Sequence, residues 1–251
     1  MKTTLKRLVS LNPKSSGRNS SGKITVRHQG GRQKRFLRHI DWKRSLTLPA
    51  RVEAIQYDPN RTSDIALLVY GNGVKDYILA PQNLKVGDSV IFSETAEIKV
   101  GNCLPLKNIP IGIEIHNLEI TPGKGAQMVR SAGNTATVQS KEGNIVVVKL
   151  PSGEIRQFDG NCRATIGSIS NPHHKEEILG KAGRKRHMGV RPTVRGVAQD
   201  PRSHPHGGGE GRSGIGMKSP KSPWGKRTLG KRTRDRKKYS NKHIIKHRYA
   251  K

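Results

Sequence analysis

The sequence predicts an all-β protein built from two small domains, barrels or sandwiches, with long basic extensions that lack regular structure. Short apolar runs rich in Val, Ile and Tyr recur between residues 50 and 169, and no helical pattern of comparable strength lies between them. The flanking segments carry almost all of the net charge. Only 32% of the 251 residues are apolar and 4% are aromatic, which is too few for one large core spanning the chain.

Eight runs predict strands, at 50–57, 64–70, 76–80, 88–92, 135–139, 144–150, 154–158 and 163–169. Turn signals such as YDPN at 57–60, GNG at 71–73 and PSG at 151–153 separate them. KITVRH at 23–28 predicts a further strand, and 173–183 is the one helix candidate. With TPGKG at 121–125 as a junction, we expect domains at 20–118 and 119–195. A basic N-terminal extension of residues 1–19 and a C-terminal extension of residues 196–251 flank them.

The charge distribution points to a polyanionic partner. The chain has 48 Lys and Arg against 18 Asp and Glu, a net charge of +30. Residues 1–40 hold 11 basic residues and no acid, residues 41–171 are nearly neutral, and residues 201–251 hold 16 basic and two acidic residues. Nucleic acid is the commonest cellular polyanion. Because residues 207–216 include six Gly, we expect 1–18 and 199–251 to be unstructured alone and ordered by the partner.

The composition also excludes several classes of protein. No apolar run approaches the roughly 18 residues of a membrane-spanning helix, and the N-terminal segment has no apolar region typical of a signal peptide. Cys103 and Cys162 lie 59 positions apart and form neither a disulfide framework nor a metal knuckle. A reducing compartment is the simplest interpretation.

Two kinds of motif, a GKG sequence and two His pairs, contain residue types that can bind phosphate or metal. GKG at 123–125 lacks the spacing of a nucleotide-hydrolase loop, and we expect its backbone N–H groups, Lys124 and Arg130 to face a phosphate backbone. The pairs His173–His174 and His204–His206 lack the further ligands that a zinc site requires. His206 as a catalytic base would need a nucleophile and an orienting partner, which its Gly-rich context does not offer.

Basic runs at 31–39, 181–196 and 225–248 are interleaved with Gly, Pro and aromatic residues. Phe36, Trp42, Trp224, Tyr239 and Tyr249 can stack on bases. Three hypotheses remain at this point: a structural rRNA-binding protein, a free nucleic-acid-binding module such as an RNA chaperone or a DNA-compacting protein, and an enzyme that uses His206 or the cysteines.

A series of motifs favours the first hypothesis. QYDPNRTSDIALLVY, GNCLPLKNIPIGIEIHNLEI, TPGKGAQMVRSAG, LGKAGRKRHMGVRPTVRG, HPHGGGEGR and SPWG follow one another in order. From about residue 15 to 251 the chain resembles the universal large-subunit ribosomal protein two family, in its bacterial or organellar form. The resemblance implies an oligonucleotide-binding-type barrel followed by an SH3-like barrel.

The resemblance further implies a non-enzymatic role on large-subunit rRNA near the peptidyl-transferase region. There the family supports assembly, subunit association and tRNA placement, while RNA supplies the chemistry. The implied partners are rRNA, neighbouring ribosomal proteins and a contact in the bridge to the small subunit, with no membrane partner and no homo-oligomer. No cofactor is expected, apart from Mg²⁺ held through bound rRNA. The implied location is the ribosome of a bacterial cytoplasm, mitochondrial matrix or plastid stroma, and the acid-free N-terminus also suits a transit segment.

The sequence departs from the family pattern at Arg32, Gln33, His187 and Gln199–Asp200. RNA contacts are expected from a set of basic, imidazole, Gly and Trp positions: Arg27, His28, Arg32, Lys34, Arg35, Arg38, Lys43, Arg44, Lys124, Arg130, Lys181, Arg184, Lys185, Arg186, Arg191, Arg195, His204, His206, Gly207, Gly208, Gly209, Arg212, Trp224, Lys226, Arg227, Lys231 and Arg232. No catalytic residue and no metal ligand is expected.

Overall fold

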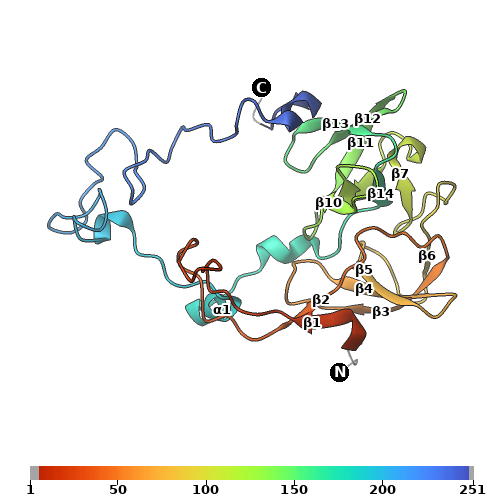
Figure 1. The fold of residues 1–251 in the computed structure, drawn as a ribbon, viewed down its shortest axis with the longest axis horizontal. Helices are drawn as coiled ribbons and strands as arrows, with labels where there is room; N and C mark the ends of the chain where they lie inside the picture. The colour runs from red at the N-terminus through yellow and green to blue at the C-terminus, as the bar shows by residue number, and fades with distance from the viewer. Residues whose placement is uncertain (1–5, 249–251) are drawn as a thin grey trace. The chain divides into compact units, whose positions relative to one another are not determined.

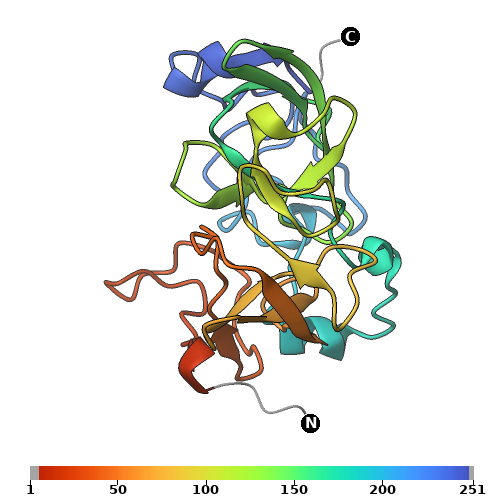
Figure 2. The same cartoon turned by 90° about the vertical axis from the view of Figure 1, so that its right-hand side faces the viewer.

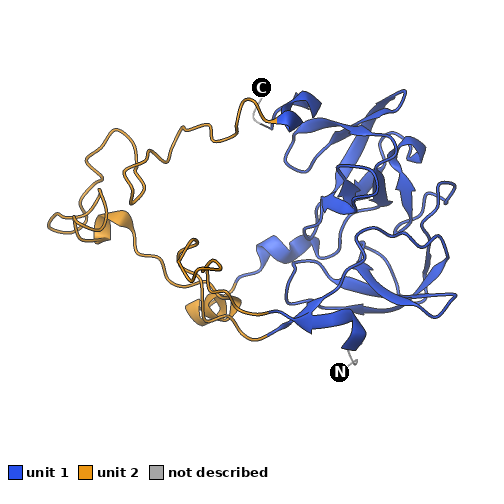
Figure 3. Cartoon of the chain, viewed as in Figure 1, with its two compact units in different colours: residues 1–12, 35–178, 239–251 blue, residues 13–34, 179–238 orange. Residues whose placement is uncertain are grey.

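The computed structural model describes residues 6–248, and the chain divides into two compact units (Figure 3). Unit 1 comprises residues 1–12, 35–178 and 239–251, and unit 2 comprises residues 13–34 and 179–238. Residues 1–5 and Tyr249, one of the aromatic residues expected to stack on bases, lie outside the described residues. Each unit therefore combines segments that are distant in the sequence.

One sheet of unit 1 has four antiparallel strands in the order β5-β4-β3-β6, which are β5 (Lys75–Leu79), β4 (Ile65–Tyr70), β3 (Ala50–Gln56) and β6 (Ser89–Val90). Buried and exposed residues alternate along β3, so Val52 and Ala54 face the core. Strand β4 is nearly continuously apolar and contributes to two core clusters. A short ribbon of β1 (Val9–Leu11) and β2 (Phe36–Arg38) adds to the unit, together with the 3-10 turn Lys6–Leu8.

The larger sheet of unit 1 has seven strands in the order β15-β13-β12-β11-β8-β14-β7. Its members are β15 (Ile244–Lys246), β13 (Ile155–Asp159), β12 (Ile145–Lys149), β11 (Ala136–Glu142), β8 (Glu114–His116), β14 (Arg163–Ile166) and β7 (Cys103–Pro105). A ribbon of β9 (Leu118–Glu119) and β10 (Ala126–Met128) lies beside it, with the 3-10 turn Leu106–Asn108. The largest core cluster packs against these strands, with Ile115 and Val148 fully buried.

The C-terminal end of the chain returns to this sheet. After the 3-10 turn Tyr239–His243, strand β15 pairs with β13, with Ile155 opposite Lys246 and Arg156 opposite Ile244. Figures 1 and 2 both show this blue segment alongside the green strands. The last part of the predicted unstructured extension therefore forms an edge strand.

Unit 2 contains the one α-helix in the described chain, α1 (Ala182–Met188), and the 3-10 turn Gly196–Ala198 (Figure 1). The rest of the unit is turns and isolated bridges. Among the described residues, no helix has both the length and the apolar character that crossing a bilayer demands.

The predicted all-β class is confirmed, and each of the eight predicted runs contains an observed strand. The strand predicted at 23–28 is wrong, because only Ile24 makes a bridge there, to Arg18. The helix predicted at 173–183 is also wrong: residues Pro172–Glu176 form a 3-10 turn, and the helix lies further on at α1. Strands β7 and β8 precede residue 118 yet pair in the seven-stranded sheet, and residues 121–125 form the turn between β9 and β10.

Candidate nucleic-acid interface

Unit 2 is highly basic and has no apolar core. Its 82 residues hold 24 Lys and Arg against three acidic residues, a net charge of +21. In residues 6–248, every buried hydrophobic side chain belongs to unit 1. Several apolar side chains of unit 2, among them Val26, Val194 and Leu229, are more than half exposed. The unit therefore offers charge and backbone to a partner and buries little of its own surface.

Helix α1 presents basic side chains on every side. None of its residues is buried, and Lys185, Arg186 and His187 form its last turn, where positive charge complements the helix dipole. The helix ends at Gly189, whose φ of 97° lies in the left-handed region that favours Gly. A helix without an apolar face buries little hydrophobic surface on packing, so most of its basic side chains stay accessible to a partner.

The N-terminal loop of unit 2 is hydrogen-bonded to the end of this helix. The N–H of Gly30 donates to the carbonyl of Gly189 (2.9 Å), and the N–H of Arg191 donates to the carbonyl of His28 (2.9 Å). The side chain of Arg186 lies against Gly31, where a Cβ atom would come within 3.4 Å of its Nη2. These bonds bring the run at 27–34 together with the run at 181–191, 150 residues later.

The Gly-rich loop is closed by its own backbone. The carbonyl of Asp200 accepts from the N–H groups of Ser203 (2.9 Å) and His204 (3.2 Å), and Gly207 N–H donates to the His204 carbonyl (2.8 Å). A Cβ atom on Gly207 would lie 2.5 Å from the Asp200 carbonyl oxygen. The loop thus requires Gly at this position, because any Cβ atom would clash with backbone.

Both histidines of the loop have intramolecular partners. His204 is buried, its ring packs on Gly196, and its Nδ1 accepts from the His206 N–H (3.0 Å). Burial lowers the pKa of His204 from its ordinary value, and its electrostatic interactions with His206 and Arg27 lower it further. The Nε2 of His206 accepts from the N–H of Lys221 (2.9 Å). In this tautomer only Nδ1 of His206 carries a proton to donate.

Lys221 begins a small hairpin that displays Trp224. Lys221 and Arg227 form an isolated bridge, Ser222 N–H donates to the Lys226 carbonyl (2.8 Å), and Gly225 N–H closes the turn onto Ser222 (2.9 Å). Trp224 is 74% exposed, with the guanidinium carbon of Arg27 located 5.8 Å from its ring centre. The N-terminal loop, the Gly-rich loop and the hairpin thus meet.

Most of the other predicted contacts in unit 2 lie on its surface. The exposed side chains are Arg27, Lys34, Lys181, Arg184, Lys185, Arg191, Arg195, Arg212, Lys226, Arg227, Lys231 and Arg232. His28, Arg32, Arg186 and His206 are half-buried. Unit 2 thus contains exposed basic residues from each of the three basic runs of the sequence.

The predicted residues of unit 1 differ among themselves. Lys43 and Lys124 are exposed, and Arg130 stacks on Trp42 at 4.6 Å from its ring centre. Arg44 is only 5% exposed and donates to the carbonyl of Gly101 (2.6 Å), so its side chain is withdrawn from the surface. Arg38 lies 3.5 Å from a carboxylate oxygen of the fully buried Asp58. Arg35 donates to the carbonyl of Pro59.

The GKG turn corrects one expectation. The backbone N–H groups of Gly123 and Gly125 were expected to face phosphate, but both donate to the carboxylate of Glu119, at 3.3 and 2.9 Å. The N–H of Arg163 donates to the same carboxylate (3.0 Å), and Glu119 is 1% exposed. Glu119 therefore occupies the position that a phosphate would take, and only the side chain of Lys124 remains available.

Sequence reasoning missed two arginines of unit 1 that lie over aromatic rings. Arg61 lies over Trp42 at 5.5 Å while its Nε pairs with Asp58. Arg163 lies over Phe92 at 4.2 Å and donates to the carbonyl of Lys43 (3.2 Å). Both are isolated basic residues in the nearly neutral middle of the sequence, so no run of charge marked them.

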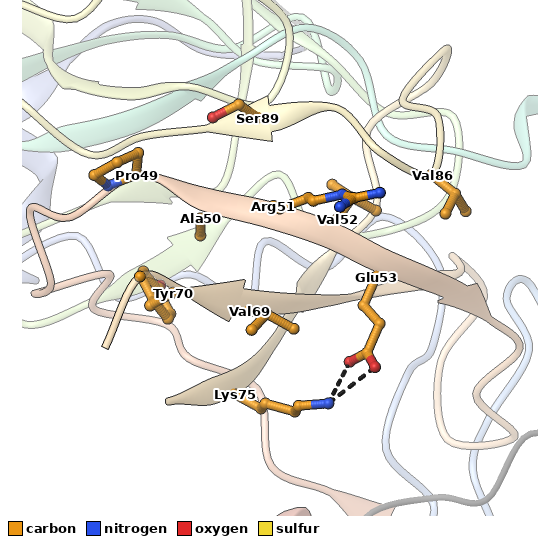
Figure 4. Close-up of a pocket in the computed structure, with 11 residues that line it drawn as sticks. Pro49, Ala50, Arg51, Val52, Glu53, Val69, Tyr70, Lys75, Val86 and Ser89 are labelled. Atoms are coloured by element: carbon orange, nitrogen blue, oxygen red, sulfur yellow. Dashed lines mark hydrogen bonds and ion pairs between the residues drawn. The ribbon is translucent and has the colours of Figure 1, made fainter. Parts of the chain in front are cut away.

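A shallow pocket lies on the outer face of the four-stranded sheet (Figure 4). Arg51 and Val69 line it, and Lys75 and Glu53 form an ion pair of 2.8 Å across its floor. The paired charges neutralise each other, and no nucleophile lies between them.

The cysteines are equally unsuited to nucleophilic chemistry. Cys103 and Cys162 are both buried as free thiols. Burial raises the pKa of both, that of Cys162 to about 12, so neither is a thiolate at neutral pH. The enzymatic hypothesis that invoked them therefore has no support in the geometry.

Comparison with known families agrees with this surface. Residues 5–92 match the family described as Ribosomal Proteins L2, RNA binding N-terminal domain. Residues 99–225 match the family described as Ribosomal Proteins L2, C-terminal domain. Together the matches span most of the chain and confirm the resemblance drawn from its motifs. The chain therefore belongs to the ribosomal protein L2 family, a structural RNA-binding component of the large ribosomal subunit.

Proposed function

We propose that unit 2 is the main rRNA-binding surface of this protein and that its Gly-rich loop positions rRNA near the peptidyl-transferase region without taking part in chemistry. The observation that carries the proposal is the net charge of +21 on a unit that has no buried apolar side chain. Assembly, subunit association and tRNA placement follow from that position. Mg²⁺ enters only through bound rRNA, and neighbouring ribosomal proteins and a small-subunit bridge complete the partners.

The energetics favour an ordering partner. Fixing the backbone of one residue costs roughly 1–2 kcal/mol, and burial of apolar surface normally offsets that cost. Unit 2 has 82 residues and lacks such burial. Phosphate contacts and the release of counterions from RNA can replace it. We therefore expect residues 199–238 to resist protease only when rRNA is bound.

The loop at 204–212 is suited to an architectural role. The Nε2 of His206 is engaged by the N–H of Lys221, and the ring of His204 packs on Gly196. A general base needs a reacting group within hydrogen-bond reach and a pKa near the working pH. Here the imidazoles instead fasten the loop to the hairpin at 220–228. The exposed Gly209 and Arg212 then present backbone and charge to RNA.

Salt dependence of binding to naked large-subunit rRNA tests the proposal. If about eight phosphates are neutralised, log K against log salt should have a slope of about −6 to −7. Arg191→Ala should reduce the magnitude of that slope by about one unit, because the variant lacks the exposed guanidinium that would contact one phosphate. Lys85→Ala removes an exposed charge from unit 1, outside the expected contacts, and serves as the matched control.

Two outcomes would contradict the proposal. A slope near −1 would mean that few phosphates are contacted. Equal effects of Arg191→Ala and Lys85→Ala on the slope would mean that only the net charge of the protein matters, and that unit 2 makes no particular phosphate contacts. Sedimentation at moderate salt separates the remaining alternative, because a free RNA chaperone would not travel with large subunits.

A further inference from the structure

Trp224 occupies an unusual position for a large aromatic side chain. It lies at the turn of the 220–228 hairpin with 74% of its surface exposed. The hairpin that carries it is held by two hydrogen bonds between its two arms and by the bond from Lys221 N–H to His206 Nε2. The indole is therefore exposed to solvent on a hairpin whose backbone is held by hydrogen bonds on both sides of Trp224.

One side of the indole already has a partner. The guanidinium carbon of Arg27 lies 5.8 Å from the ring centre, within the roughly 6 Å range of a cation–π contact. Arg27 is held in place by its neighbour His28, whose carbonyl accepts from Arg191 N–H. With most of the indole exposed, the face away from Arg27 is open to a second planar group.

The charges around the ring specify the chemistry of that group. Lys226 and Arg227 follow Trp224 after a single Gly, and both are exposed. The nearest acidic residues along the chain are Glu210 and Asp235, each more than ten positions away. A ligand with a flat aromatic ring joined to a phosphate therefore fits the site better than an apolar protein side chain does.

We propose that Trp224 and Arg27 form a docking site for one unpaired RNA base, with the flanking phosphates bound by Lys226 and Arg227. The base stacks on the open face of the indole, so that the indole lies between the base and the guanidinium. A base inside a duplex has both faces covered by its neighbours, which confines the site to a bulged, looped or terminal nucleotide. The inference rests on the proposed rRNA-binding function and names the class of nucleotide that one part of the surface takes.

Fluorescence of the full-length chain provides the test, since Trp42 and Trp224 are its two Trp residues. In a Trp42→Phe background, a single-stranded RNA nonamer should quench the emission of Trp224, whereas a blunt duplex of the same length should not. Replacing the central nucleotide with an abasic site should weaken binding about tenfold, as measured by anisotropy of the labelled RNA, because one base–aromatic stack is lost.

Trp224→Leu should abolish this discrimination between the intact and abasic strands, while Trp224→Phe should retain part of it. Arg27→Gln should weaken single-strand binding more than Lys23→Gln, which removes one exposed charge from the same loop without touching the ring. Equal affinity of the Trp224→Leu variant for both strands, with an unchanged salt slope of rRNA binding, is the expected pattern.

Retention of the full discrimination by Trp224→Leu would overturn the inference, as would equal quenching by the duplex. In either case an unchanged salt slope with rRNA would leave the proposed function standing. A lost slope would instead show that the rRNA-binding surface itself is misassigned.

Discussion

Gly207→Ala is the sharpest perturbation of the Gly-rich loop that we propose binds rRNA. A Cβ atom at this position would lie 2.5 Å from the carbonyl oxygen and 2.6 Å from the carbonyl carbon of Asp200, and 2.7 Å from the carbonyl oxygen of Gln199. All three are backbone atoms, so no side chain can turn aside. The Asp200 carbonyl accepts two hydrogen bonds within the loop, and moving it breaks both.

The magnitude follows from those bonds. Each intramolecular hydrogen bond contributes about 1 kcal/mol, so forcing the loop open costs about 2–3 kcal/mol. If the closed loop is the form that binds, affinity for rRNA falls by about 30- to 150-fold. Filter binding to large-subunit rRNA measures this, and competition with the unaltered protein during subunit reconstitution measures the effect on assembly.

Gly214→Ala is the matched control, because a Cβ there meets no atom within 4 Å and the backbone is not in the left-handed region. It should bind rRNA within about twofold of the unaltered protein, since exposed substitutions without such contacts usually change little. If Gly207→Ala behaved like Gly214→Ala, the closed loop would not be the RNA-binding form, and the architectural argument would be refuted.

Three further predictions concern single side chains. Burial of His116 lowers its pKa to about 4 from 6.5. Because the unfolded chain binds the proton more readily, the free energy of unfolding should fall by about 3 kcal/mol as the pH drops from 6.5 to 4. Urea titrations across that pH range measure this, and a stability that does not change with pH would contradict it. Asp58→Ala leaves Arg38 and Arg61 without their buried carboxylate and should lower unfolding free energy by about 3 kcal/mol, visible as a lower denaturant midpoint. His206→Gln keeps an acceptor for Lys221 N–H, so single-turnover peptide-bond formation on fully assembled subunits should stay within about tenfold; a thousandfold loss with normal tRNA occupancy would indicate chemistry.

The strands of the middle region follow from the sequence because their signal is local. Along β3 the alternation of Val52 and Ala54 with charged neighbours directly encodes one buried face. The basic runs likewise predict a nucleic-acid-binding surface, since charge density needs no knowledge of the fold. The motif series from YDPN to SPWG identified the family before any contact was known.

Helix α1 lies beyond that kind of reasoning. Periodicity finds helices through an apolar face, and α1 buries none of its residues. The prediction instead followed the residues around Ile178, which is 84% exposed and not helical. What ends the helix is Gly189 and its bond to Gly30, a contact between segments 159 positions apart.

The individual roles of charged residues were decided by tertiary structure. Lys124 and Arg44 look alike in the sequence, yet one is exposed and the other is buried against Gly101. The Glu119 carboxylate accepts hydrogen bonds from the backbone N–H groups of the GKG turn, a contact that no local sequence pattern reveals. The sequence by itself determined the fold class, the basic character and the family of this protein. Which basic side chains are exposed and which are buried depended on tertiary contacts, because burial and hydrogen bonding join residues that no short window of sequence contains.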